Sequence, residues 1–292
     1  MPLSVSGGAL SIAAEGYACD IAPDHGGALL SLRDRQGEML RAGHLAEAAA
    51  DPRNAGAFPC VPWFGRLYDG LVFGGIRHEI APALPDCTPD HPLHGEGWVS
   101  AWEVVTHTED RVACRFASDG RAPGGFPFAY AATQDFRLTR DGLTVKLALA
   151  NAGDAMMPAG LGLHPYFVRA ADTRIAFQAS KRWTPPAAGQ GRLSPIAGRL
   201  GAGAPAALPD ETLDHTFAGF GGEAIISGAG GAVLRLKSDA PALHVFAPAG
   251  EAYFCLEPVT HLPGELTRGA SGFGGRVLNP LEIMSVTMLI GR

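Results

Sequence analysis

The stretch that decides the fold is residues 140–149, which read Arg-Asp-Gly-Leu-Thr-Val-Lys-Leu-Ala-Leu. Leucine or valine stands at every odd position from 143 to 149, and Thr144, Lys146 and Ala148 stand between them. A period of two residues is typical of a β-strand that buries one face and exposes the other. The Asp-Gly pair in front of it is a turn signal. The stretch therefore predicts an amphipathic strand that follows a tight turn.

Similar strand signals recur along the chain, whereas helical signals are scarce. The helix candidate, residues 44–50, is short and is soon followed by Pro52. Residues 185–209 are rich in Ala, Gly and Pro and predict a long surface loop. Regularly spaced strands without helical crossovers predict an all-β fold, a large antiparallel β-sandwich, in one domain over residues 1–292. The other expected strands are residues 102–107, 112–117, 224–227, 233–237, 243–247, 253–259 and 282–290, with hairpins at 108–111 and 228–231.

The composition excludes several classes of function. Of 292 residues, 39 are Gly and 23 are Pro, so turns are frequent, but 47% are hydrophobic, which excludes a disordered chain. A net charge of −6 argues against nucleic acid as a partner. No leader peptide or membrane-spanning stretch is visible. Five scattered cysteines without a CxxC pair indicate reduced thiols, and we expect a cytoplasmic protein.

Two polar residues interrupt apolar stretches that read as buried strands. His164 lies in Gly-Leu-His-Pro-Tyr-Phe, and Glu257 lies in Phe-Cys-Leu-Glu-Pro-Val. Burying either group has a cost unless it is paired, so we expect an acid and a base held in one half-dry cleft. We expect Pro165 to fix a turn, and Pro258 to place Glu257 at a strand end or sheet edge. The structural alternatives are a core histidine bonded to backbone and an ion pair of Glu257 with an arginine.

Three further residues are candidates for the same site. His94 precedes a glycine that lets the backbone approach a ligand, or it caps a turn. His91 lies three residues earlier, so a metal site of His91, His94 and His164 is an alternative, although we predict no metal. Arg66 offers a planar fork of donors for hydroxyls or a carboxylate, and Asp214 is an acceptor for hydroxyls; a salt bridge and a turn anchor are the alternatives.

The other aromatic and histidine residues are more simply interpreted as parts of the core or the surface. Trp63, Trp98 and Phe217 offer stacking faces for a sugar ring, although aromatics in a sandwich are more often core. The common nucleotide, zincin and serine-hydrolase motifs are absent. The remaining histidines are expected to be ordinary surface or core residues: His25, His44, His78, His107, His215, His244 and His261.

Taken in order, these segments resemble the aldose 1-epimerase (mutarotase) family over nearly the whole chain. The resemblance departs at Gly65, where the family typically has Asn, and at Leu281, where it has Gly. The motifs that carry it are Phe58-Pro59-Cys60-Val61-Pro62-Trp63 through Arg66 and Asp69-Gly70, Leu93-His94-Gly95 with Trp102-Glu103-Val104, residues 160–167 around His164, Leu256-Glu257, and Leu278-Asn279-Pro280-Leu281-Glu282.

The resemblance implies a cofactor-independent enzyme that interconverts the α and β anomers of a free sugar. In that mechanism Glu257 takes the proton of the C1 hydroxyl while His164 donates to the ring oxygen. His94 polarises the region of C1, and Arg66 and Asp214 bind hydroxyls. The alternatives are a mutarotase for hexose 6-phosphates and a sugar-binding module without catalysis. The expected partner is a small-molecule sugar.

Overall fold

Residues 143–149 belong to strand β11 (Gly142–Asn151), in which the apolar side chains are buried and Lys146 is exposed. The computed structural model describes residues 8–68, 70–84, 91–184, 191–228, 232–267 and 272–292. In these residues strands dominate, and the named strand pairs all run antiparallel. The predicted antiparallel sandwich is therefore confirmed.

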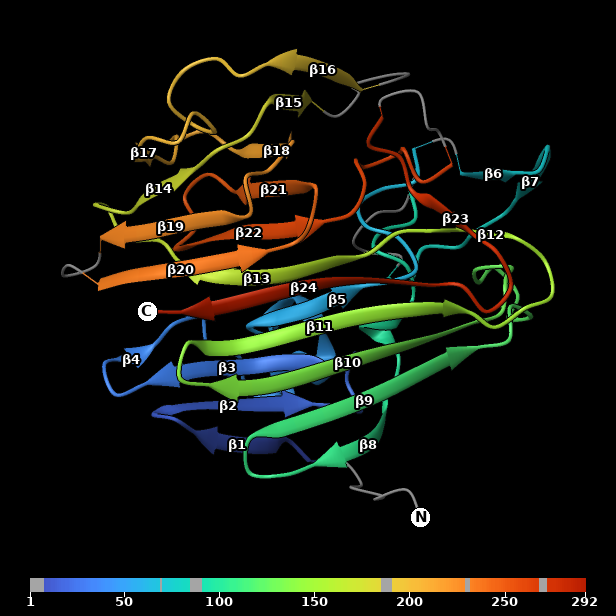
Figure 1. The fold of residues 1–292 in the computed structure, drawn as a ribbon, viewed down its shortest axis with the longest axis horizontal. Helices are drawn as coiled ribbons and strands as arrows, with labels where there is room; N and C mark the ends of the chain where they lie inside the picture. The colour runs from blue at the N-terminus through green and yellow to red at the C-terminus, as the bar shows by residue number, and fades with distance from the viewer. Residues whose placement is uncertain (1–7, 69, 85–90, 185–190, 229–231, 268–271) are drawn as a thin grey trace.

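The first sheet has eleven strands (Figure 1). A small strand, β4 (Gly37–Glu38), pairs only with β3. The order of the others across the sheet is β1 (Leu10–Ala14), β2 (Tyr17–Ala22), β3 (Ala28–Asp34), β5 (Ala57–Cys60), β13 (Gly162–Val168), β22 (Tyr253–Val259), β21 (Ala242–Ala247), β18 (Leu213–Ala218), β15 (Lys181–Thr184) and β16 (Arg192–Pro195).

The second sheet has nine strands. Their order is β17 (Ala206–Ala207), β14 (Arg174–Phe177), β19 (Glu223–Gly228), β20 (Ala232–Ser238), β24 (Ile283–Gly291), β11, β10 (Tyr130–Thr139), β9 (Arg111–Ser118) and β8 (Glu103–His107). Two-stranded sheets and short helices complete the described fold: β12 (Met157–Ala159) with β23 (Arg276–Leu278), β6 (Leu71–Phe73) with β7 (Ile76–His78), α1 (Leu45–Ala50), η1 (Pro52–Asn54) and η2 (Gly97–Val99).

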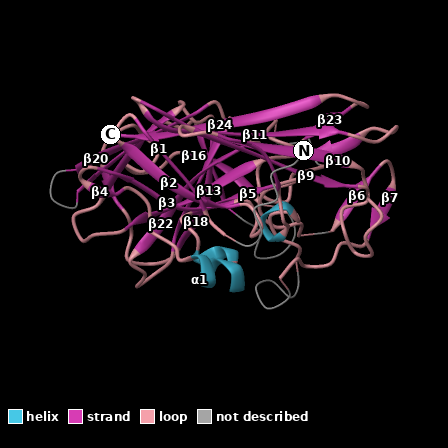
Figure 2. Ribbon diagram, turned by 90° about the horizontal axis from the view of Figure 1, so that it is seen from below, coloured by secondary structure: helices cyan, strands magenta, loops and turns pink. Residues whose placement is uncertain are grey.

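The main core lies between the two large sheets. It joins Leu32 and Phe254 of the first sheet to Phe136 and Met288 of the second in one cluster of buried side chains. Figure 2 shows the layers on edge, with β11 and β24 near the top, β18 and β22 below them, and α1 below those strands. The helix therefore lies on the outer side of the eleven-stranded sheet. No helix in the described part of the chain has the length and apolarity needed to cross a membrane.

The turn expected at Pro165 is wrong, whereas the strand end expected near Pro258 is confirmed and the sheet edge is not. Pro165 lies inside β13 rather than in a turn, and Pro258 lies on β22, an interior strand that ends one residue later. Proline has no N–H for the ladder. The two prolines lie where pairing between β13 and β22 is interrupted, between the register pairs Gly162↔Val259 and Tyr166↔Cys255. An interior strand tolerates Pro258 because the interruption needs no donor there.

The other element predictions largely hold. The helix expected at residues 44–50 is α1, and the seven other expected strands correspond to β8, β9, β19, β20, β21, β22 and β24. The loop expected at residues 185–209 is partly wrong, because it contains β16 and β17. Asp69, residues 185–190 and the hairpin tip at 229–231 lie outside the described residues.

Candidate active site

Side chains of the eleven-stranded sheet alternate between the core and an outer face. On β21, Leu243 and Val245 belong to the main core, whereas His244 and Phe246 line a cavity on the opposite side. The alternation is the ordinary period of a strand. A polar residue between two buried apolar ones is therefore placed on the outer face by geometry alone.

The strand register brings five of these outer-face residues into one row. Across β5, β13, β22, β21 and β18 the row reads Phe58, His164, Glu257, His244 and Thr216. Between β13 and β22, paired residues on both sides place His164 opposite Glu257. Directly opposite residues on antiparallel strands have Cβ atoms about 5 Å apart and share a face. Two histidines thus flank one glutamate.

His164 and Glu257 form a close, buried pair. Nε2 of His164 lies 3.3 Å from Oε1 of Glu257, and their side chains are 8% and 1% exposed. Burial raises the pKa of Glu257 to about 8 and lowers the pKa of His164 to about 3. Both shifts favour the uncharged forms. At neutral pH the pair therefore holds one proton, which lies on Glu257 in the resting state.

The pair also has unused hydrogen-bonding capacity. Among the described residues, neither Nδ1 of His164 nor either carboxylate oxygen of Glu257 has a hydrogen-bond partner. The His164 ring is held by Phe58 and Tyr166, whose ring centroids lie 4.4 and 4.8 Å away. Buried polar atoms are normally bonded, so atoms left open at a cavity wall are suited to a polar ligand.

His94 is fixed in a defined tautomer. The N–H of Gly65 donates to Nδ1 of His94 at 3.2 Å, and the N–H of His94 donates to the carbonyl of Gly65 at 3.1 Å. Burial lowers the pKa of His94 well below its ordinary value. A neutral ring whose Nδ1 accepts carries its proton on Nε2. His94 is therefore a neutral donor toward the cavity, and its own φ of +59° shows how tightly the backbone is turned there.

Arg66, Asp214 and His244 form a second polar group. Asp214 forms an ion pair on each side, with Oδ1 3.3 Å from Nε2 of His244 and Oδ2 3.8 Å from Nη1 of Arg66. Burial opposes the ionisation of both Asp214 and His244, but the contact with His244 lowers the pKa of Asp214. The charge of Glu257 and the contact with Asp214 together raise the pKa of His244. Thr216 Oγ1 lies 2.8 Å from Nδ1 of His244.

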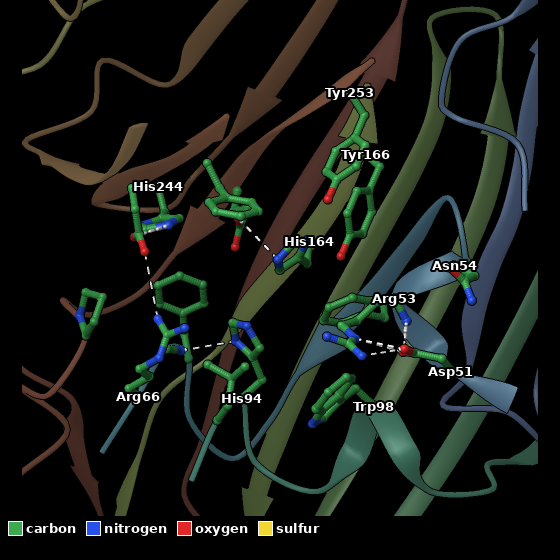
Figure 3. Close-up of a pocket in the computed structure, with 18 of the residues that line it drawn as sticks. Asp51, Arg53, Asn54, Arg66, His94, Trp98, His164, Tyr166, His244 and Tyr253 are labelled. Carbon is green, nitrogen blue, oxygen red and sulfur yellow. Dashed lines mark hydrogen bonds and ion pairs between the residues drawn. The ribbon is translucent and has the colours of Figure 1, made fainter. Parts of the chain in front are cut away.

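One cavity of about 700 Å³ connects these groups. Figure 3 shows His94, His244 and Arg66 on one side of His164 and Tyr166, Tyr253 and Arg53 on the other. The arginines on its wall are already engaged: Arg66 with Asp214, Arg53 with Asp51, and Arg41 with the carbonyls of Arg53 and Ala55. The cavity is polar without a cluster of unpaired cations among the described residues.

All five predicted site residues line this cavity: His164, Glu257, His94, Arg66 and Asp214. His164 and Glu257 are side by side on neighbouring strands and face the same cavity. The arginine partner suggested for Glu257 is absent from the described ion pairs; its neighbours are histidines.

Sequence reasoning overlooked His244, which belongs to the site, and of the three aromatics considered as stacking faces two have the core position that was the more common alternative. Trp63 and Phe217 are 2% and 1% exposed and belong to the main core, whereas Trp98 does line the cavity. His261 is a buried residue, as one of its plain interpretations expected, and its Nε2 accepts from the N–H of Phe64 at 3.0 Å.

One set of described side chains has ligand atoms within reach of a single ion. It comprises His164, Cys255 and Glu257, with atoms within 4.8 Å of one another, and it includes neither His91 nor His94. A cysteine binds a metal as its thiolate, but burial raises the pKa of the Cys255 thiol well above its ordinary value. This donor set therefore does not fit a metal centre well.

Comparison with known proteins finds a matching family and a relative of similar length. The family model described as aldose 1-epimerase matches residues 9–291. The uncharacterised protein YphB of Escherichia coli K12 is 30% identical over 268 residues, which are 85% of this chain and 87% of that protein.

Solved structures share the fold. A candidate aldose 1-epimerase from Escherichia coli K12 superposes with a TM-score of 0.85 at 28% identity, covering 97% of this chain and 98% of that one. A galactose mutarotase-like protein from Clostridium acetobutylicum gives a TM-score of 0.84 at 19% identity, with 97% and 94% covered, and shows the fold alone. Together with the family match, these likenesses establish that the chain belongs to the aldose 1-epimerase family.

Proposed function

We propose that the protein is an aldose 1-epimerase that interconverts the α and β anomers of a free aldose. The observation that carries the proposal is the buried His164–Glu257 pair, 3.3 Å apart at the wall of a polar cavity. Exchange of anomers needs one proton removed and one added at two oxygens bonded to the same carbon. Two groups side by side reach such a pair of oxygens together.

The reaction begins from the charge-separated form of the pair. Transfer of the shared proton from Glu257 to His164 gives a carboxylate and an imidazolium without changing the proton count. The Glu257 carboxylate takes the proton of the C1 hydroxyl, the C1–O bond to the ring oxygen breaks as the carbonyl forms, and the ring oxygen takes the proton of His164. Rotation about C1–C2 and closure on the other carbonyl face reverse both transfers. Each positioned group can contribute about 10²–10⁴-fold.

The remaining residues bind and orient. His94, a neutral donor through Nε2, hydrogen-bonds an oxygen near C1, and Asp214 with Arg66 binds ring hydroxyls. A free sugar is favoured over a phosphorylated one because the arginines of the cavity wall already have partners among the described residues. A phosphate is normally recognised by arginines that are open to it.

The test is anomer exchange followed by NMR, with a panel of free aldoses and glucose 6-phosphate. We expect the purified protein to accelerate exchange of at least one free aldose above the spontaneous rate. A preference for the phosphate would favour the phosphorylated class, and sugar binding without any acceleration would support a binding module instead.

A further inference from the structure

Glu257 lies between two imidazoles that the fold treats differently. His164 faces it from β13 and His244 faces it from β21, each directly across the strand register. Nδ1 of His164 has no partner among the described residues. Both ring nitrogens of His244 face oxygens, Asp214 Oδ1 at 3.3 Å and Thr216 Oγ1 at 2.8 Å. The imidazole of His164 is therefore open to a ligand, whereas both nitrogens of His244 already contact residues of the sheet.

The contacts of His244 suit the protonated, positively charged form of its ring. A carboxylate and a hydroxyl can both accept, so an imidazolium, which donates from both nitrogens, satisfies both contacts. The ring is 7% exposed and lies against Phe64, with ring centroids 5.2 Å apart. The other titratable groups around it are Glu257 on β22, Arg66 on the segment after β5, and the imidazoles of His94, His164 and His215.

We infer that His244 is a positioning residue: as an imidazolium fixed by Asp214 and Thr216, it favours the charge-separated form of the Glu257–His164 pair, in which Glu257 is the carboxylate that removes the proton from the sugar. This inference rests on the proposed function. His244 does not deliver a proton itself, because both of its nitrogens are occupied. It acts through its charge on the carboxylate opposite.

The position of His244 explains how a buried site can keep Glu257 available as a base. Burial alone favours the neutral Glu257–His164 pair, in which Glu257 holds the proton. A positive charge on the neighbouring strand favours a proton on His164 rather than on Glu257, because Glu257 is the nearer of the two in the row. The same charge also makes the pair lose its last proton more easily. Removal of His244 should therefore lower the rate and make that last proton harder to remove.

The first experiment reads the charge of His244 directly in the wild-type protein. The ¹⁵N shifts of its ring nitrogens should show an imidazolium at pH 7, and Asp214→Asn should convert it to the neutral form. A neutral His244 in the wild-type protein at pH 7 overturns the inference. This readout needs no substrate and no catalytic activity.

The second experiment follows anomer exchange against pH in His244→Gln. We expect the plateau rate to fall about tenfold and the alkaline limb to move up by about one pH unit. A wild-type plateau and limb in a folded His244→Gln overturn the inference. Thr216→Val should move both in the same direction by less, which provides a second variant if His244→Gln fails to fold.

Two controls separate charge from structure. His244→Lys restores a cation and should return the alkaline limb toward the wild-type position. His107→Gln makes the same substitution at an exposed site on β8 and should leave the pH profile of anomer exchange unchanged. If the wild-type protein exchanges no aldose, the proposed function fails; if it does and His244→Gln behaves like wild type, the further inference alone fails.

Discussion

Gly65 and His94 hold each other through two hydrogen bonds, one from each backbone N–H. Gly65 has a φ of +70°, and a Cβ added there would lie 2.8 Å from Cβ of Pro263. The family resemblance implies asparagine at this position. In this chain the close approach of Pro263 requires glycine, and the contact to His94 comes from the backbone. The geometry around His94 therefore depends on glycine at this position.

Replacement of Gly65 by alanine should destabilise the protein and weaken activity. The positive φ costs about 1–2 kcal/mol with a Cβ, and the collision with Pro263 adds to it. Thermal unfolding gives the first effect and anomer exchange the second. Gly74→Ala is the matched control, because Gly74 has a φ of +60° with nothing within 4 Å of its added Cβ. Equal destabilisation by the two substitutions would show that Pro263 contributes nothing.

Loss of either member of the central pair should abolish most of the activity. Glu257→Gln removes the base and His164→Asn removes the acid, and each should slow exchange by at least about 10²-fold while the protein still folds. Because the two act on one shared proton, the double variant should be little slower than the slower single one. Exchange at the wild-type rate in either variant would remove that residue from the mechanism.

Leu281 offers a test of stability away from the site. Its φ is +66° and its side chain is 83% exposed, in a turn where Glu282 N–H donates to Asn279 O at 3.0 Å. Leu281→Gly should stabilise by about 1 kcal/mol, because relief of a strain of about 1–2 kcal/mol exceeds the entropic cost of glycine. The melting temperature reports this. Leu281→Ala keeps the strained φ and should show no comparable gain; a similar gain would attribute the effect to the exposed leucine side chain.

Local patterns were enough to predict the sandwich and several of its strands. The alternation on β11 and the apolar runs of β13 and β22 depend on side-chain sequence alone. His164 and Glu257 were predictable because each is a titratable group within an apolar strand. Their side-by-side placement was not, because it depends on the pairing of strands about 90 residues apart.

His244 was overlooked for a related reason. Between Leu243 and Val245 it reads as one polar residue in an alternating strand, which is unremarkable by itself. Its importance comes from the hairpin register that sets it opposite Glu257. The five residues that connect β21 to β22, 248–252, would have indicated this register if the loop geometry had been known. Gly65 likewise depends on contacts with distant Pro263, which no local pattern records.

The pH dependence of anomer exchange by the wild-type protein tests the central claim most directly, namely that His164 and Glu257 share one proton. After subtraction of the spontaneous rate, we predict a plateau from about pH 5 to pH 7 and a fall above about pH 8, where the pair loses its proton. A rate that instead climbs through pH 8 would mean that Glu257 acts as an isolated base, and it would contradict the account.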